Sequence, residues 1–198
     1  MKRVVCLILG FFFASSLAAA NNGVSVEEPT FLGTACAKGH SSVALSEDGS
    51  TLSIFFDQYV VTAGGDTGVS TARKYCDVAV HLSIPPSLSV AVRKVDYSGG
   101  NDLPDAAYAR FSTEYFFAGD RGPHFEETFM GPIAESYALS EPTADSEIAW
   151  SQCGKSLVLR STSNMLVTSP SLQLAHARVD AEGSMPGIVF HLEYKACE

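Results

Sequence analysis

Residues 73–97 alternate apolar and polar side chains over most of their length, and this pattern constrains the fold more than any other feature of the chain. A period of two is typical of a half-buried strand, because successive side chains of a strand point to opposite faces of the sheet. Residues 85–87, Pro-Pro-Ser, interrupt the run. The pattern predicts a hairpin, or two neighbouring strands, at the centre of an antiparallel sheet. The alternating apolar residues are Cys76, Val78, Val80, Leu82 and Ile84, then Leu88, Val90 and Val92.

The rest of the sequence also consists mainly of short segments with the composition and alternation of strands. About nine or ten of them follow one another at spacings of roughly 10 to 20 residues, with hardly any helical periodicity. We interpret residues 98–104 as a loop, residues 135–147 as an acidic connection and residues 148–153 as a strand, while residues 172–179 fit either a strand or a short helix. The pattern predicts an all-β fold, an antiparallel β-sandwich or jelly roll, in one domain covering residues 21–198.

The first 20 residues have the features of a signal peptide. Lys2 and Arg3 precede an apolar run over residues 4–14, and three alanines at residues 18–20 form a cleavage site. A membrane anchor is the alternative, but a membrane-spanning helix needs roughly 20 apolar residues. We therefore expect cleavage after Ala20 and a secreted, extracellular or periplasmic protein with no membrane span after removal of the signal peptide.

The charge balance argues against several classes of partner. The chain has 13 Lys and Arg against 22 Asp and Glu, and without Lys2 and Arg3 the net charge becomes −11. Nucleic-acid binding depends largely on neutralisation of phosphates by Lys and Arg, and anionic lipids require the same kind of surface. Neither partner is expected for this acidic chain.

Four cysteines remain once Cys6 has left with the signal peptide. An even number in an exported chain predicts two disulfides. Spacing does not choose among the three possible pairings. We favour Cys36 with Cys76 and Cys153 with Cys197, because each bridge would cross-link one half of the chain. Each bridge would contribute roughly 3 to 4 kcal/mol to the free energy of unfolding. A zinc site is not expected, since the sequence contains no Cys-x-x-Cys and no histidine close to two cysteines.

The sequence contains no motif that predicts catalysis, a metal or a cofactor. The His-x-x-x-His spacing of zinc enzymes and the Gly-x-Ser-x-Gly elbow of hydrolases are both missing. Two alternatives stay open: a hydrolase that uses paired carboxylates such as Asp57 and Asp96, and a structural or inhibitory protein that presents Arg121 on a turn. Carboxylates in the loops would suit calcium, but we favour a solvated acidic rim as their explanation.

Several short motifs resemble one family over nearly all of the mature chain. They are Gly33-Thr34-Ala35-Cys36, Leu52-Ser53-Ile54-Phe55-Phe56-Asp57, Arg73-Lys74-Tyr75-Cys76, Asp96-Tyr97-Ser98-Gly99, Glu114-Tyr115-Phe116-Phe117-Ala118-Gly119, Gly131-Pro132, Trp150-Ser151-Gln152-Cys153-Gly154 and His191-Leu192-Glu193-Tyr194. The chain resembles the secreted four-cysteine family catalogued as domain of unknown function 4360. It departs from the family at Ala37, where proline is frequent, and at Tyr194, where tryptophan is common. The resemblance implies a secreted, disulfide-bonded β domain and carries over no catalytic residue.

We therefore expect a non-catalytic extracellular module that binds a surface glycan or a protein. The chain is rich in aromatic residues, and two or three of them on one exposed face would form a binding platform. Arg73, Lys74, Asp96 and Tyr97 are the candidate binding residues. They bracket the predicted central hairpin, and we expect all four at the same end of one sheet.

Overall fold

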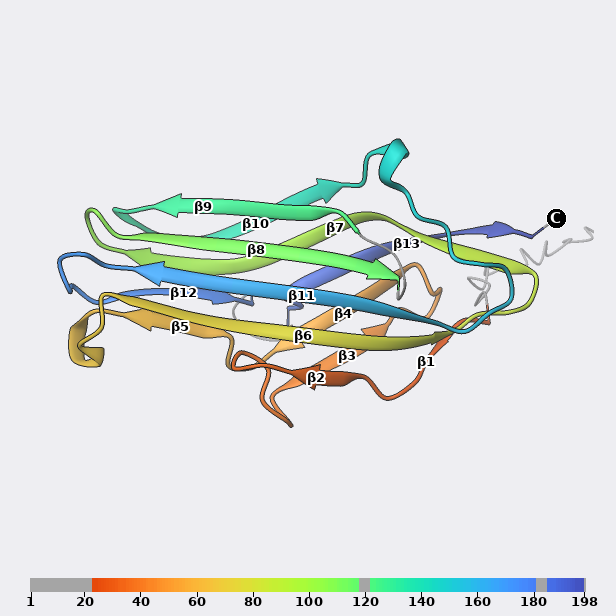
Figure 1. Ribbon diagram of the computed structural model, residues 1–198, viewed down its shortest axis with the longest axis horizontal. Helices are drawn as coiled ribbons and strands as arrows, with labels where there is room; N and C mark the ends of the chain where they lie inside the picture. Colours follow the sequence, from red (N-terminus) through yellow and green to blue (C-terminus); the bar gives the residue numbers. More distant parts are fainter. Residues whose placement is uncertain (1–22, 118–121, 181–184, 198) are drawn as a thin grey trace, which may run out of the picture.

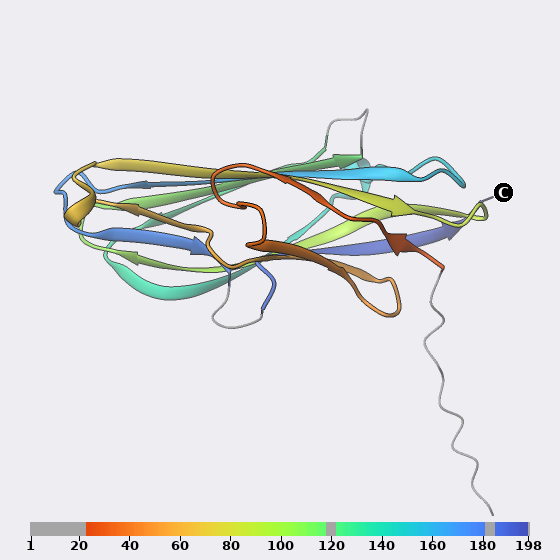
Figure 2. The same cartoon turned by 90° about the horizontal axis from the view of Figure 1, so that it is seen from below.

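The protein is a sandwich of two antiparallel sheets, seen as two layers in Figure 2. The computed structural model describes residues 23–117, 122–180 and 185–197. The predicted signal peptide lies outside these residues. Within these ranges, the elements other than strands are two short 3-10 helices, η1 (Gly65–Thr67) and η2 (Asp145–Glu147). No helix in the described ranges has the length and apolar character to cross a membrane. The all-β sandwich predicted from the alternating pattern is confirmed.

Sheet A lies in front in Figure 1. Its strands follow the order β1-β6-β11-β8-β9, and β2 pairs with β6 beside β1. Its central strands β6, β11 and β8 are long and paired over most of their length, so the outer face of this sheet presents a broad surface. The bounds are β1 (Ser25–Val26), β2 (Thr30–Leu32), β6 (Thr71–Ser83), β11 (Leu157–Thr168), β8 (Tyr108–Phe117) and β9 (His124–Met130).

Sheet B lies behind, with the order β3-β4-β13-β7-β12-β5. Its longest strand, β7, pairs with β13 and β12 along one edge and with β10 along the other. The bounds are β3 (Ser41–Leu45), β4 (Thr51–Phe56), β5 (Val60–Ala63), β7 (Leu88–Leu103), β10 (Ile133–Pro142), β12 (Ala175–Val179) and β13 (Ile188–Ala196).

The predicted central hairpin is wrong, although both of its strands exist. β6 belongs to sheet A and β7 to sheet B, so the chain crosses between the sheets at residues 84–87. Alternation specifies which face of a strand is buried, because the period of two assigns side chains to faces. Alternation does not specify which other strand pairs with it in the sheet. Both strands bury their apolar face in the same core from opposite sides.

Three segments also differ from their expected state. Residues 98–103 continue β7 as strand, and most of the acidic connection is strand β10. The segment at residues 148–153 is not a regular strand, while the ambiguous stretch contains strand β12. The polar residues and glycines of residues 98–103 and of β10 led to the interpretation as loop and connection. In the structure they occupy solvent-facing or tightly packed positions of paired strands.

Inward-facing side chains of both sheets form one core. Tyr97 of β7 packs edge-on to Phe111 of β8, with 5.4 Å between ring centroids, and stacks with Phe125 of β9 at 4.9 Å. Tyr115 of β8 meets Phe190 of β13 at 5.5 Å. Each pair joins a strand of sheet A to a strand of sheet B, so these contacts hold the two layers together.

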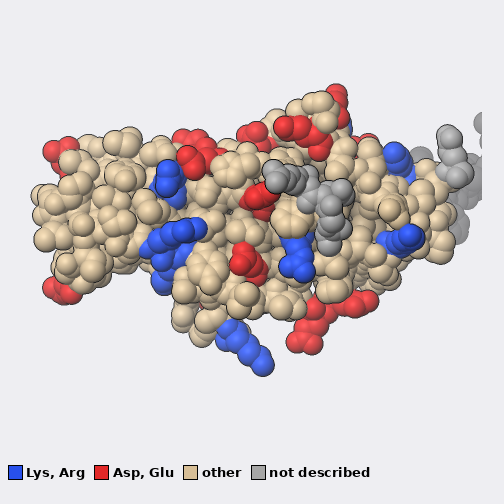
Figure 3. Space-filling view, in the orientation of Figure 1, with Lys and Arg blue, Asp and Glu red and all other residues tan. Residues whose placement is uncertain are grey.

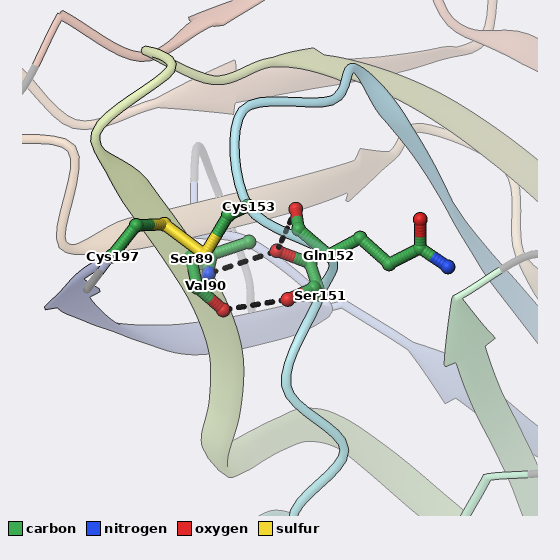
Figure 4. The surroundings of a disulfide bond; sticks show 6 residues. All are labelled: Ser89, Val90, Ser151, Gln152, Cys153 and Cys197. Atoms are coloured by element: carbon green, nitrogen blue, oxygen red, sulfur yellow. Dashed lines mark hydrogen bonds between the residues drawn. A yellow bond between two sulfur atoms is a disulfide. The ribbon is translucent and has the colours of Figure 1, made fainter.

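Two disulfides have the favoured pairing, Cys36–Cys76 and Cys153–Cys197. The first ties the segment after β2 to β6. The second joins the segment before β11 to the chain after β13 (Figure 4). Beside it, the Ser89 hydroxyl donates to the Ser151 carbonyl at 2.7 Å, and the Val90 amide donates to the Ser151 hydroxyl at 3.0 Å. The second bridge therefore fastens two segments across the start of β7.

Candidate functional site

The four candidate residues predicted from sequence do not form one site. Arg73 points outward from sheet A and Lys74 takes the opposite phase of the same strand. Asp96 points outward from sheet B, and Tyr97 is only 2% exposed in the core. The expectation that they share one end of a sheet depended on the hairpin. Because β6 and β7 lie in different sheets, the four residues separate onto different surfaces.

Asp96 is the centre of a polar cluster on the outer face of sheet B. Its carboxylate accepts a hydrogen bond from the Ser140 hydroxyl at 2.6 Å and lies 2.6 Å from Nε2 of His191. The ammonium of Lys94 is 3.1 Å from the same carboxylate oxygen as the histidine. The residues come from β10, β13 and β7, so the cluster links three adjacent strands.

The cluster contains a serine, a histidine and an aspartate, but not in the order of a hydrolase. A nucleophilic serine needs the histidine beside its own oxygen, with the carboxylate behind the histidine. Here the carboxylate of Asp96 stands between Ser140 and His191. His191 contacts Asp96 and not the Ser140 oxygen, so we interpret the cluster as a structural link between strands.

Burial by itself raises the pKa of the Asp96 carboxyl. The hydrogen bonds from its three polar neighbours outweigh burial, and the pKa of this carboxyl lies below its usual value. A carboxyl whose pKa is depressed by folding stabilises the folded state above its unfolded pKa of about 3.9. This contribution disappears as the pH falls through the depressed folded value.

We expect Asp96→Asn to lower the free energy of unfolding by about 1 kcal/mol at neutral pH, because the carboxylate is partly exposed and solvent screens its charge. The difference from the parent protein should shrink as the pH approaches about 3. Urea titrations across this pH range would measure it. Asp102→Asn is a matched control on β7, since Asp102 only faces His176 at 4.0 Å. Parallel pH profiles for parent and Asp96→Asn would contradict the assignment.

The register of sheet B also separates Asp57 and Asp96, the two carboxylates named as a possible catalytic pair. In the register of sheet B, Asp96 pairs with Val189, and Val189 pairs with Ser53. Asp57 lies four residues beyond Ser53, past the end of β4. Two strand spacings and four residues place the Cα atoms of Asp57 and Asp96 about 16 Å apart. Glycosidases hold their two carboxyls about 5 to 9.5 Å apart, so these two are not a catalytic pair.

Two adjoining hollows of about 320 and 310 Å³ follow β7 and β10 on the outer face of sheet B. Small residues on both strands, among them Ser98, Gly100 and Ala138, leave this space. A wider hollow of about 680 Å³ lies between β2 and β3, beside Phe31 and Lys38. None of these hollows combines exposed aromatic rings with cationic side chains in the way that the outer face of sheet A does.

The outer face of sheet A carries six residues that we call the tyrosine–arginine face. They alternate with buried core residues on three paired strands, so their side chains take the outward phase. The tyrosine of β6, Tyr75, is 38% exposed. The tyrosine–arginine face consists of Arg73 and Tyr75 on β6, Asn164 and Leu166 on β11, and Tyr108 and Arg110 on β8.

The strand register sets the spacing on this face. Arg73, Leu166 and Arg110 form one row across β6, β11 and β8. Tyr75 lies level with Asn164, while Tyr108 lies level with Thr168, which is four residues further along β11. Strand spacing and rise place the two tyrosine Cα atoms about 16 Å apart on a diagonal, with the arginine row between them.

Polar contacts hold the two arginines in place. The guanidinium of Arg73 donates to the side-chain oxygen of Asn164. Nε of Arg110 lies 3.9 Å from a carboxylate oxygen of Glu126 on β9, which is an ion pair longer than a hydrogen bond. Figure 3 shows this side of the molecule, where basic and acidic side chains are interspersed. The face combines aromatic rings, hydrogen-bond donors and an apolar centre at Leu166.

Within the described ranges, no three His, Cys, Asp or Glu side chains are grouped so that they could hold a metal ion. Arg121, the candidate inhibitory tip, lies outside the described residues. The tyrosine–arginine face was missed in the sequence as a unit, because its members come from three strands up to 93 positions apart and only the pairing of β11 brings them together.

Comparison with known proteins gives one curated relative by sequence and several solved structures with low similarity of fold. An uncharacterised secreted protein of Arthroderma benhamiae is 29% identical over 141 residues, 71% of this chain, and the match spans 58% of that protein. Two carbohydrate-binding modules have a loosely similar shape. A family 61 module in complex with β-1,4-galactotriose gives a TM-score of 0.34 at 9% identity, covering 84% of this chain and 88% of its own. A family 11 module from Clostridium thermocellum gives a TM-score of 0.19 at 11% identity, covering 84% of this chain and 91% of the module.

The family model for a domain of unknown function, DUF4360, matches residues 22–197. This range includes both sheets and all four disulfide-bonded cysteines. Disulfides persist in oxidising, extracellular surroundings, and the curated relative is secreted. The protein is extracellular, and the chain belongs to the DUF4360 family.

Proposed function

We propose that this protein is a non-catalytic extracellular module that binds a surface glycan through the tyrosine–arginine face. One observation carries the proposal: two tyrosines and two arginines share the outward phase of β6 and β8, the two strands that pair with β11 from either side. The sequence reasoning required an exposed aromatic face for a binding module. On the outer face of sheet A, Tyr75 is exposed and Tyr108 is half-buried with its side chain on the outward phase.

The chemistry of the face suits a sugar chain. A tyrosine ring has an apolar body and a polar tip, so it can pack against the C–H face of a sugar while its hydroxyl stays solvated. Arginine and asparagine supply several N–H donors for sugar hydroxyls. Tyrosine and arginine are also the residues that most often dominate binding surfaces. A broad sheet provides a rigid support for such contacts.

The first test is binding of the purified, oxidised mature protein to a glycan array and to cell-wall preparations. We expect reproducible binding to at least one polysaccharide. Silence across the array and the cell-wall material would overturn glycan recognition. The chain would then be tested for a protein partner by pull-down from culture medium.

Tyr75→Ala and Tyr108→Ala should each weaken binding to the glycan by about tenfold, because each removes one ring from the platform. Isothermal titration or affinity electrophoresis would measure the change. Phe55→Ala is the matched control, since Phe55 is a half-buried aromatic on the outward phase of β4 in sheet B. An equal loss of affinity in all three variants would show that the tyrosines do not form the binding surface.

A further inference from the structure

Two arginines lie at the same level on the tyrosine–arginine face, on either side of an apolar residue. Arg73 and Arg110 both pair in register with Leu166, from opposite edges of β11. Two strand spacings place their Cα atoms about 10 Å apart. The arginine row lies between Tyr75 and Tyr108, so a chain that contacts both rings crosses the row at Leu166, with Arg73 on one side and Arg110 on the other.

We propose that the ligand of this face is an acidic polysaccharide, whose carboxylates bind Arg73 and Arg110 while its sugar rings pack on the two tyrosines. This inference rests on the proposed function. The polymer would run diagonally over β6, β11 and β8, along the line that joins the two tyrosines.

Arginine favours this class of ligand over a neutral one. A guanidinium is planar, always charged and able to bind a carboxylate with two parallel hydrogen bonds. Arg73 donates to the neutral amide oxygen of Asn164, which leaves its charge uncompensated by that contact. Arg110 lies near Glu126 only at 3.9 Å, with half of its own side chain exposed. A ligand carboxylate would form shorter, charge-assisted bonds with both.

The other charges of the face do not cancel this site. Asp77 and Glu114 both pair with Thr162, four residues along β11 from Leu166, which places them about 13 Å from the arginine row. Charges at the surface are largely screened beyond about 8 Å at physiological salt. The negative net charge of the whole chain is screened in the same way, so a ligand responds mainly to the groups that it touches.

The test compares the affinity of the disulfide-bonded protein for polygalacturonate, for a neutral galactan and for dextran sulfate. We expect polygalacturonate to bind at least about tenfold more tightly than the neutral polymer, because two charge-assisted contacts are added. The advantage should fall as salt rises from about 0.05 to 0.5 M. Tighter binding of dextran sulfate would identify sulfate rather than carboxylate. A DNA duplex serves as an unrelated polyanion and should not bind.

Variants separate the arginines from the tyrosines. Arg73→Gln and Arg110→Gln should each reduce the preference for polygalacturonate over the neutral polymer by about fivefold or more, because glutamine keeps an N–H donor for sugar hydroxyls and loses the charge that binds a carboxylate. Tyr75→Ala should weaken both polymers alike. Arg160→Gln is the matched control. Arg160 is exposed on the outward phase of β11, about 20 Å along the strand from Leu166, and its loss should change neither affinity.

The outcomes distinguish this inference from the proposed function. Equal affinity for the acidic and neutral polymers would overturn the acidic-ligand inference and leave glycan binding standing. The same holds if Arg160→Gln abolishes the preference as strongly as the other two arginine variants, or if DNA binds as well as polygalacturonate. Binding to none of the polysaccharides, and to no glycan on the array, would overturn both.

Discussion

Replacing Gly99 with alanine should lower the free energy of unfolding by about 3 kcal/mol, as expected for a side chain added where no space exists. Gly99 lies on the inward phase of β7, directly opposite Tyr137 of β10 in the register. A Cβ atom at this position would overlap the carbonyl oxygen of Arg178 and the hydroxyl of Tyr137. That hydroxyl donates to the same carbonyl at 3.0 Å.

The Gly99→Ala substitution would disturb an aromatic contact as well as the hydrogen bond of Tyr137. The Tyr137 ring stacks on Phe129 of β9, with 4.7 Å between centroids, and so joins sheet B to sheet A. Displacing the ring disturbs that contact as well as the hydrogen bond. In a domain of this size, a loss of about 3 kcal/mol corresponds to a fall in Tm of roughly 6 to 12 °C, which differential scanning calorimetry would detect.

Gly100→Ala is the matched control for this prediction. Gly100 is the next residue of the same strand, but a Cβ atom there would meet only the flexible guanidinium of Arg178, at 3.2 Å. Alanine also costs less conformational entropy than glycine in a strand. We expect a change within about 1 kcal/mol. Similar losses for both variants would show that the close approach of Tyr137 is not what requires glycine.

The same position shows why part of the fold could not be predicted from the sequence. Residues 98–103 contain two adjacent glycines among polar residues, a composition typical of a loop. They form strand because a tyrosine 38 positions later covers Gly99 from the neighbouring strand. Local composition carries no information about such a cross-strand partner. The alternating segments β6 and β7 were predictable, since their period of two is itself local.

The binding face was unpredictable for a related reason. Arg73 stood out in the sequence, but its partners on the face come from β8 and β11, and only the sheet order makes them neighbours. Tyr97 was a candidate binding residue because it brackets the predicted hairpin. Its phase on β7 places it in the core instead. Sequence reasoning gave the fold class and the disulfide pairing, while the site depended on which strands pair.

Removing the Cys153–Cys197 bridge by a double alanine substitution should lower the free energy of unfolding by about 4 kcal/mol, from loss of the constraint on the unfolded chain. Removing Cys36–Cys76 should cost about 1 to 2 kcal/mol more. The bridges span 44 and 40 residues, so chain entropy predicts nearly equal effects. They differ in burial, and Cys36 and Cys76 are only 1% and 0% exposed.

The two double variants therefore control for each other. Cys153 is exposed and Cys197 half-buried, so their replacement leaves no cavity, whereas alanine at Cys36 and Cys76 removes two sulfur atoms from the core. Guanidinium unfolding of each variant at neutral pH, without reductant, would give the comparison. If the exposed bridge proved as costly as the buried one, packing around Cys76 would contribute nothing beyond the cross-link. A larger loss at Cys36–Cys76 would show that this bridge is part of the core that holds β6, and with it Arg73 and Tyr75, in position.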